Sequence, residues 1–189
     1  MQQLLKCDLC GSDAYAVVFR ADEAQINQIV KCDSCGLMYA NPRSDAPDHV
    51  EVAQYDPDFV ENSIAHNDTP RLKKEALQVR DYDTTRKFLA ERFPNRGKLL
   101  EVGSGLGFLL DYFKKDGWDT TGVEPNRGMC RYAQKKLGLH ALPEILTDAK
   151  FPGESFDAVL MMHVIEHVPD PTDTLKEIHR VLRPGPGCS

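Results

Sequence analysis

From residue 98 onward, short apolar runs alternate with segments whose apolar residues recur at helical spacing. The apolar runs predict four strands, at 98–102, 118–124, 139–142 and 155–162. The segments between and after them predict helices through Phe113, through Lys136 and from Pro171 to Leu182. Repeated strand and helix units are typical of a parallel sheet with right-handed crossovers. The sequence therefore predicts an α/β, Rossmann-like parallel sheet with flanking helices over 96–189.

Near the N-terminus, two short runs at 14–20 and 27–32 predict the strands of a small hairpin. Two C-x-x-C pairs flank this hairpin: Cys7, Cys10, Cys32 and Cys35. In a reducing compartment, such pairs favour a tetrahedral thiolate Zn²⁺ site over disulfides. A closed shell of four thiolates leaves no position for water, so the zinc would be structural. We therefore expect a zinc ribbon over 1–43; free buried cysteines are the alternative.

The segment 44–95 is interpreted as a linker followed by a packing helix. Its first part is rich in Pro, Asp and Asn and has no sustained period, with a short helix expected around 55–62. Thr69 and Pro70 form an N-cap and first-turn pair, and the apolar residues that follow predict a helix that ends before Pro94. We expect this helix to pack across the sheet.

Composition and charge limit the possible partners. With 189 residues, 41% of them hydrophobic and 28% charged, the chain can bury a substantial core. A net charge of −6 argues against nucleic acid, and the ribbon, with four Lys or Arg against five Asp or Glu up to Arg43, shows no basic face. The first residues include no long apolar run, so we expect no leader, no membrane partner and a cytoplasmic location.

The stretch LLEVGSGLGFLL places three glycines between a strand and a helix, and Glu101 lies two residues before the first glycine. A dinucleotide-binding turn is expected to read G-x-G-x-x-G, so that a pyrophosphate can approach the helix N-terminus. A carboxylate at Glu101 would repel a pyrophosphate and suits a cationic cofactor. Glu124 ends the next strand, where it could accept hydrogen bonds from both ribose hydroxyls. Ribose recognition alone fits either NAD or S-adenosylmethionine (SAM).

Four segments in order resemble the class I SAM-dependent methyltransferases: EVGSGLG, GVEPN, FDAVLMMHVIEHVPDP and LKEIHRVLRPG. The resemblance covers residues 98–185 and implies a cofactor site in three parts. Those parts are Gly103, Ser104, Gly105 and Gly107 at the methionine moiety with Glu101 near its amino group, Glu124 and Pro125 at the ribose, and Thr147, Asp148 and Ala149 at the adenine. An NAD site and a glycine turn that serves packing alone are the alternatives. The ribbon closing on CGLMYANPR also resembles that of many bacterial methyltransferases, some of which act on sugars or polyketide glycosides.

After the fourth predicted strand, HVIEHVPDP spaces His163, Glu166 and His167 so that they would share one face of a helical turn. Two imidazoles and a carboxylate could supply a general base or bind a divalent metal. They could equally hold the loop by hydrogen bonds. The quinol O-methyltransferases carry a related Glu-x-x-Glu-His, in which His163 here replaces the first acid. We name these three residues as the catalytic candidates.

Class I methyltransferases have a seven-stranded sheet, and this sequence stops where the family's fifth strand would begin. We therefore expect an incomplete class I fold, whose fourth strand has an apolar, unpaired edge through which a homodimer could form. The predicted function is methyl transfer from SAM to a small-molecule acceptor such as a sugar, a quinol-like compound or another metabolite. The alternative is a zinc-containing SAM-binding module without turnover.

Overall fold

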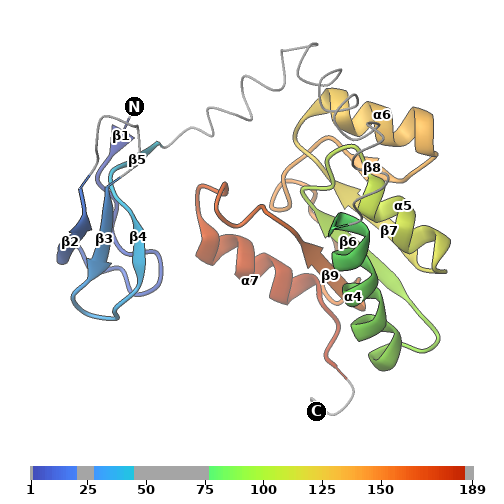
Figure 1. Cartoon of the computed structure of the whole chain (residues 1–189), viewed down its shortest axis with the longest axis horizontal. Helices are drawn as coiled ribbons and strands as arrows, with labels where there is room; N and C mark the ends of the chain where they lie inside the picture. The colour runs from blue at the N-terminus through green and yellow to red at the C-terminus, as the bar shows by residue number, and fades with distance from the viewer. Residues whose placement is uncertain (1, 21–27, 45–76, 186–189) are drawn as a thin grey trace.

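The computed structural model describes residues 2–20, 28–44 and 77–185. The N-terminal unit contains β1 (Gln2–Gln3), β2 (Tyr15–Phe19), β3 (Ile29–Cys32), β4 (Met38–Ala40) and β5 (Arg43–Ser44). The C-terminal unit contains α4 (Leu77–Arg92), β6 (Lys98–Val102), α5 (Phe108–Lys115), β7 (Asp119–Val123), α6 (Arg127–Leu137), β8 (Ala141–Leu142), β9 (Ala158–Met161) and α7 (Pro171–Val181). The two units are coloured blue and green to red in Figure 1.

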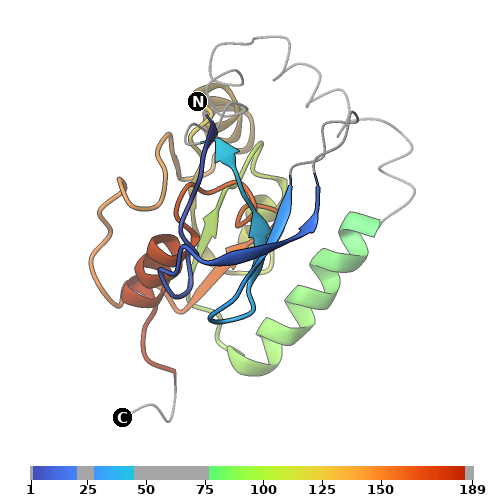
Figure 2. The same ribbon diagram turned by 90° about the vertical axis from the view of Figure 1, so that its left-hand side faces the viewer.

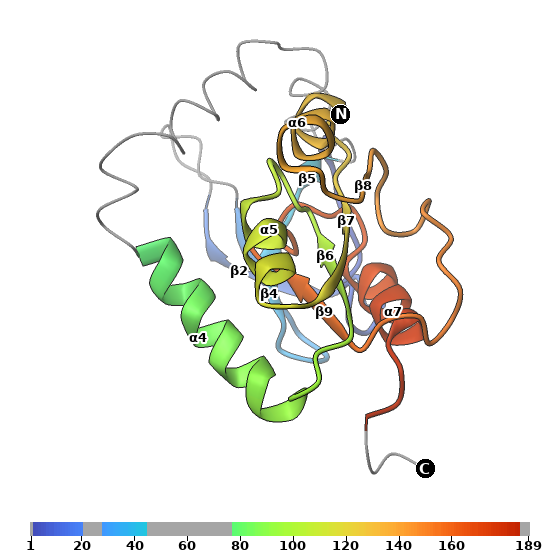
Figure 3. The ribbon, with the colours of Figure 1, turned by 90° about the vertical axis from the view of Figure 1, so that its right-hand side faces the viewer.

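The C-terminal unit is built on a four-stranded parallel sheet in the order β8-β7-β6-β9. The order of the strands changes direction beside β6, which lies between β7 and β9. Ligands of open parallel sheets bind outside the carboxyl ends of the strands at such a point. Helices lie on both faces, with α4 and α5 on one side and α7 on the other (Figure 1, Figure 3). The predicted Rossmann-like fold is confirmed.

The strand β6 separates two hydrophobic cores because its side chains alternate between the faces of the sheet. Leu99 belongs to the core beneath α4, α5 and α6, which also contains Leu89 of α4 and Phe113 of α5. Leu100 belongs to the core beneath α7, which also contains Val181. Glu101 therefore faces the α5 side of the sheet, two residues after Leu99, at the carboxyl end of the strand.

The N-terminal unit is a small antiparallel ribbon. The strands β2, β3 and β4 form one sheet, and β1 pairs with β5 in a second, two-stranded one. Its core consists of Cys7, Val30, Cys32 and Tyr39, all of them buried. The sequence predicted β2 and β3 and missed β1, β4 and β5. In β4, buried Tyr39 pairs with Val30 of the neighbouring strand. Figure 2 views the molecule from the side of this ribbon.

The described residues leave part of the predicted linker untested. The short helix expected around 55–62 and the start at Thr69 and Pro70 lie outside them, and the boundaries near 43 and 95 stay predictions. The end of the packing helix is confirmed, because α4 ends at Arg92, before Pro94. Among the described residues, no helix has both the length and the apolar character needed to cross a bilayer.

Candidate functional site

The turn between β6 and α5 is shaped by glycines in the left-handed region of backbone space. Gly103, Gly105 and Gly107 have φ angles of 71°, 52° and 85°, which glycine adopts without a steric cost. The backbone N–H groups of Gly103 and Ser104 donate to the carbonyl of Val123 at 2.9 and 3.1 Å. These bonds fix the turn to the carboxyl end of the adjacent strand β7.

The three glycines face different surroundings. A β-carbon on Gly103 would lie 2.3 Å from Cγ2 of Val164, and one on Gly107 would lie 2.6 Å from Cδ1 of Leu139. A β-carbon on Gly105 would have no neighbour within 4 Å. Gly103 and Gly107 therefore allow close packing, whereas Gly105 borders open space. Of the three, Gly105 has the free side that a bound molecule would need.

We expect Gly103→Ala to destabilise the fold more than Gly105→Ala does. Both variants strain a backbone with positive φ, at a cost of roughly 1 kcal/mol. Only the first also drives a methyl group into Val164, which adds about 1–3 kcal/mol of overpacking. Urea unfolding measures the difference. Equal loss of unfolding free energy in the two variants would show that the contact with Val164 is not tight.

Glu124 directly follows β7 and binds the glycine turn. Its Oε2 accepts a hydrogen bond from the backbone N–H of Gly105, and its Oε1 accepts one from the N–H of Asn126, both at 2.8 Å. Burial raises the pKa of Glu124, and these two bonds oppose the rise. A carboxylate has about four lone-pair positions, so each oxygen can still accept one more donor. Glu124 can therefore hold the turn and accept ribose hydroxyls at the same time.

Glu101 is a buried acid with one oxygen unsatisfied. The residue is 4% exposed, and within the described part of the chain its Oε2 has no hydrogen-bond partner. Burial, followed by repulsion from Glu124, raises the pKa of Glu101 to about 8. Burying such a group without a partner costs free energy. A cationic ligand group would supply both the missing donor and the missing positive charge.

Ser104 adds a second unsatisfied polar atom to the same turn. Its Oγ is buried and, among the residues described, unpartnered. A β-carbon on Gly122 would lie 2.7 Å from this oxygen, so the glycine makes room for the serine. Gly122 was not predicted from the sequence as part of the site. The orphaned oxygens of Glu101 and Ser104, together with the open side of Gly105, fit a ligand with an ammonium group, as the amino-acid part of SAM has.

The pH dependence of ligand binding follows from the buried position of Glu101. Below pH 8 the acid is mostly neutral in the free protein, and an ammonium beside it would make it ionise and release a proton. We expect the affinity for S-adenosylhomocysteine (SAH) to rise with pH by up to about tenfold per unit, and to level off near 8. The same raised pKa makes the ligand-free fold lose stability as pH rises from about 4.3 towards 8.

Calorimetry in two buffers of different ionisation enthalpy measures the released proton directly. Wild-type protein at pH 7 should release most of one proton for each SAH bound, and Glu101→Gln should release none from this site. An affinity that does not change between pH 6 and 8 would contradict the assignment of Glu101 to the ligand's amino group.

The predicted adenine contacts lie in a turn after β8. The N–H groups of Asp148 and Ala149 both donate to the carbonyl of Ile145, at 3.1 and 3.2 Å. Thr147 and Asp148 are exposed, and Ala149 is half-buried against the core beneath α7. Pro125, the remaining predicted contact, is half-buried beside Glu124. These placements leave the adenine and ribose assignments as predictions.

His163, Glu166 and His167 lie in the loop between β9 and α7, and not on a helical turn as the sequence predicted. His163 has a φ of 55°, in the left-handed region, which a right-handed helix excludes. Its Nδ1 lies 3.9 Å from Oε1 of Glu166, and its side chain is 90% exposed. The metal-ligating atoms of the three residues do not form a cluster among the described residues. These positions do not support a shared divalent-metal site, and the roles of the three residues as a general base or in holding the loop stay predictions.

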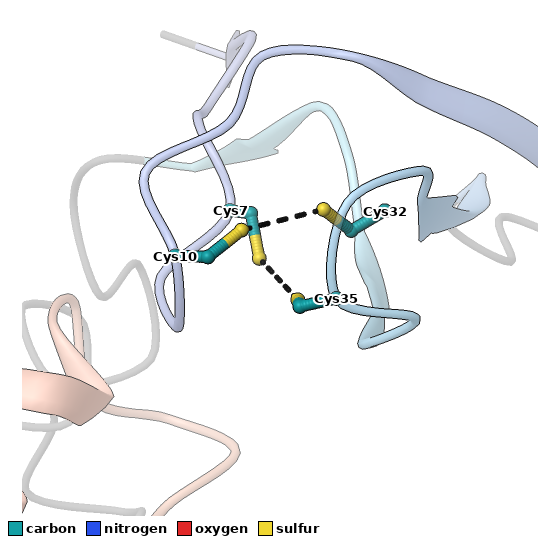
Figure 4. A group of neighbouring side chains, drawn as sticks. All are labelled: Cys7, Cys10, Cys32 and Cys35. Carbon is teal, nitrogen blue, oxygen red and sulfur yellow. Dashed lines mark hydrogen bonds between the residues drawn. The ribbon is translucent and has the colours of Figure 1, made fainter.

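The four N-terminal cysteines converge on one point (Figure 4). Their Sγ atoms all lie within 4.8 Å of one another, and the pairs Cys7–Cys35 and Cys10–Cys32 are 3.5 Å apart. Sulfurs at the corners of a Zn–S tetrahedron with bonds of 2.3 Å would lie about 3.8 Å apart. The geometry fits a tetrahedral zinc ion.

The turns that carry the cysteines are ordered by their own backbone. The N–H of Gly11 donates to the carbonyl of Cys7 at 2.8 Å, and that of Gly36 donates to Cys32 at 3.0 Å. Both glycines have positive φ, 74° and 78°, which glycine adopts without a steric cost. A hydrogen bond from the backbone of Cys35 lowers the pKa of Cys32 to about 6, whereas burial and the neighbouring thiols raise the pKa values of Cys10 and Cys35. Thiolates are the form that binds metal.

Comparison with known proteins finds a family match in the C-terminal unit. Residues 100–187 match the family described as "Methyltransferase domain". The chain is 35% identical over 114 residues to a ubiquinone biosynthesis O-methyltransferase of Ruegeria pomeroyi. The aligned region covers 56% of this chain and 42% of that protein. The chain thus spans about half the length of the curated relatives it matches.

Solved structures show the same fold. A putative SAM-dependent methyltransferase of Methanococcus maripaludis superposes with a TM-score of 0.55 at 15% identity, over 78% of this chain and 64% of that one. The plantazolicin methyltransferase BpumL, solved in complex with SAH, superposes with a TM-score of 0.56 at 19% identity, over 72% of this chain and 53% of that one. At these identities the likeness shows the fold alone.

Proposed function

We propose that this chain binds SAM and transfers its methyl group to an oxygen of a small-molecule acceptor, because residues 100–187 match the family described as "Methyltransferase domain". The observation that carries the proposal is the buried Glu101, whose Oε2 has no partner among the described residues at the carboxyl end of the central strand. The O-methyltransferase name of the Ruegeria relative supports oxygen as the acceptor atom.

Each residue of the site has a distinct task in this proposal. Glu101 pairs with the ammonium of the cofactor, and Glu124 accepts the ribose hydroxyls while it holds Gly105 in place. When bound, SAM supplies a sulfonium-activated methyl group, which leaves sulfur as a bond to the acceptor oxygen forms. The chain contributes chiefly by positioning the reactants and excluding water.

The acceptor hydroxyl must lose a proton during transfer, and the loop after β9 carries two imidazoles that can accept it. His163 lies beside Glu166, whose carboxylate would stabilise the imidazolium that forms. His167 is the second candidate. Loss of a general base typically costs 10²–10⁴-fold in rate. The rate of methyl transfer is measured for His163→Ala and for His167→Ala. The variant whose rate falls by this amount identifies the base.

Single-turnover transfer tests the proposal. Excess protein is mixed with methyl-labelled SAM and either a catechol-type phenol or a sugar, and the label in the small-molecule fraction is counted. Labelled methyl ether supports methyl transfer to oxygen. Binding of SAM without label in any acceptor would identify a SAM-binding module without turnover, which is the second candidate function.

We also propose that copies of this chain associate through β9. Within the described residues β9 is the last strand of the sheet, and its only strand partner there is β6. A parallel bridge between Phe156 and Leu182 covers the start of this edge and not the strand itself. Unpaired apolar edges tend to pair with another chain. Sedimentation over a wide concentration range should show dimers, and a strictly monomeric species would contradict this.

A further inference from the structure

A hydrogen bond joins the cysteine cluster to the C-terminal unit, between two residues that are 164 positions apart in the sequence. The hydroxyl of Thr172 donates to the backbone carbonyl of Asp8. Asp8 lies between Cys7 and Cys10, in the first turn of the cluster. Figure 1 shows α7 on the side of the sheet that faces the ribbon. The proposed zinc site therefore contacts the start of α7 directly.

The first turn of α7 is held by several hydrogen bonds. Oδ1 of Asp170 accepts a hydrogen bond from the N–H of Asp173 at 2.8 Å, which caps the helix. The carbonyl of Asp170 accepts from the hydroxyl and the N–H of Thr174, at 2.9 and 3.1 Å. Pro171 occupies the first turn, where its missing N–H costs nothing. A displacement of Thr172 would therefore also displace Asp170, the last residue of the preceding loop.

The preceding loop, residues 162–170, is anchored at its other end by the glycine turn. Val164 lies against the α-carbon of Gly103, and the N–H of His167 donates to the carbonyl of Val164 at 2.8 Å. The loop carries His163 and Glu166 as well. It is therefore held between the proposed cofactor turn at one end and the cysteine cluster at the other.

We propose that Thr172 is a positioning residue, through which the zinc-bound ribbon holds the loop 162–170 in place on the acceptor side of the site. The inference rests on the proposed function, in which this loop faces the acceptor. The ribbon has a core of four buried residues, which is too small to keep its shape without the metal. Loss of zinc would therefore release the carbonyl of Asp8 and loosen the loop.

Hydrogen–deuterium exchange of the full chain tests this coupling without any acceptor. Four samples are compared: zinc-loaded wild type, zinc-stripped wild type, zinc-loaded Thr172→Val and zinc-stripped Thr172→Val. Thr172→Val keeps the shape of the side chain and removes the donor, and Thr172→Ser, the matched control, keeps the hydroxyl. The exchange of β6 amides verifies that each sample remains folded. SAH binding is measured by calorimetry on the same samples.

We expect amides of 162–170 to exchange about threefold to tenfold faster in zinc-loaded Thr172→Val and in zinc-stripped wild type, which is the effect of one hydrogen bond. Stripping zinc from Thr172→Val should add little, and Thr172→Ser should behave as wild type. Unchanged exchange in Thr172→Val, or an equal further rise on stripping it, overturns the coupling. If the coupling is seen and SAH does not bind the wild type, the proposed function fails, and only the coupling of the ribbon to the loop 162–170 stands.

Discussion

Replacing Cys32 and Cys35 together with serine is expected to abolish zinc binding and unfold the N-terminal ribbon. Both residues belong to the group of four converging sulfurs, and Cys32 is also one of the four buried core residues of the ribbon. Structural zinc contributes roughly 10–16 kcal/mol of apparent binding free energy in small domains, more than such a core can supply. The zinc content measured by elemental analysis should fall from one ion per chain to none.

The matched control for this double variant is Cys130→Ala. Cys130 is buried in the core beneath α5 and α6 and is not part of the cysteine cluster. This variant should keep its zinc. Wild-type protein expressed with zinc that contains no metal, or a double variant that retains it, would rule out the proposed zinc site. The sheet of the C-terminal unit should stay folded in all three proteins, because its two cores contain no residue of the ribbon.

Glu124→Ala is expected to weaken SAH binding by about one to two orders of magnitude. A lost hydrogen bond to a charged acceptor costs roughly 1.5–3 kcal/mol. The substitution removes the proposed ribose acceptor, and it also removes the observed bond to the N–H of Gly105, which orders the turn. Calorimetric titration with SAH measures the change.

Two controls separate the contributions of Glu124. Glu124→Gln replaces one of the two accepting oxygens by an NH₂ group, which would face the N–H of Gly105 or of Asn126 without bonding it, so we expect an intermediate loss. Glu91→Ala removes an exposed carboxylate on α4 and should leave the affinity unchanged. An unchanged affinity in Glu124→Ala would show that the ribose assignment is wrong.

The layout of the C-terminal unit could be predicted from local patterns. The run 98–102 is apolar apart from its two charged residues, and the three glycines that follow have few roles other than a tight turn between a strand and a helix. The strand predicted over 155–162 was too long at both ends, because β9 occupies only Ala158–Met161. Pairing with the neighbouring strand, and not apolar character alone, sets these limits.

The details that give the site its chemistry depend on contacts between distant residues. No local pattern states that Glu124 would bind the N–H of Gly105, or that Gly122 would make room for Ser104. The positive φ of His163 was also not predictable, since the spacing of HVIEH is equally that of a helix. The contact between Val164 and Gly103 fixes this loop, and it forms only in the folded chain.

In the ribbon, the spacing of the cysteines predicted the cluster, because two C-x-x-C turns at the ends of a hairpin meet at one point. Where the ribbon would lie against the other unit was not predictable. The bond between Thr172 and Asp8 joins residues that share no motif. It depends on tertiary packing between the two units and not on a local sequence pattern.

Titration of the wild-type chain with SAH and, separately, with NAD⁺ tests the central claim most directly. We expect SAH to bind one per chain and to release most of a proton at pH 7, because the ammonium of the ligand ionises Glu101. NAD⁺ should not bind, because it offers no ammonium group to satisfy the buried carboxyl of Glu101. Binding of NAD⁺, or no binding of SAH by folded, zinc-loaded protein, would contradict the proposed cofactor site.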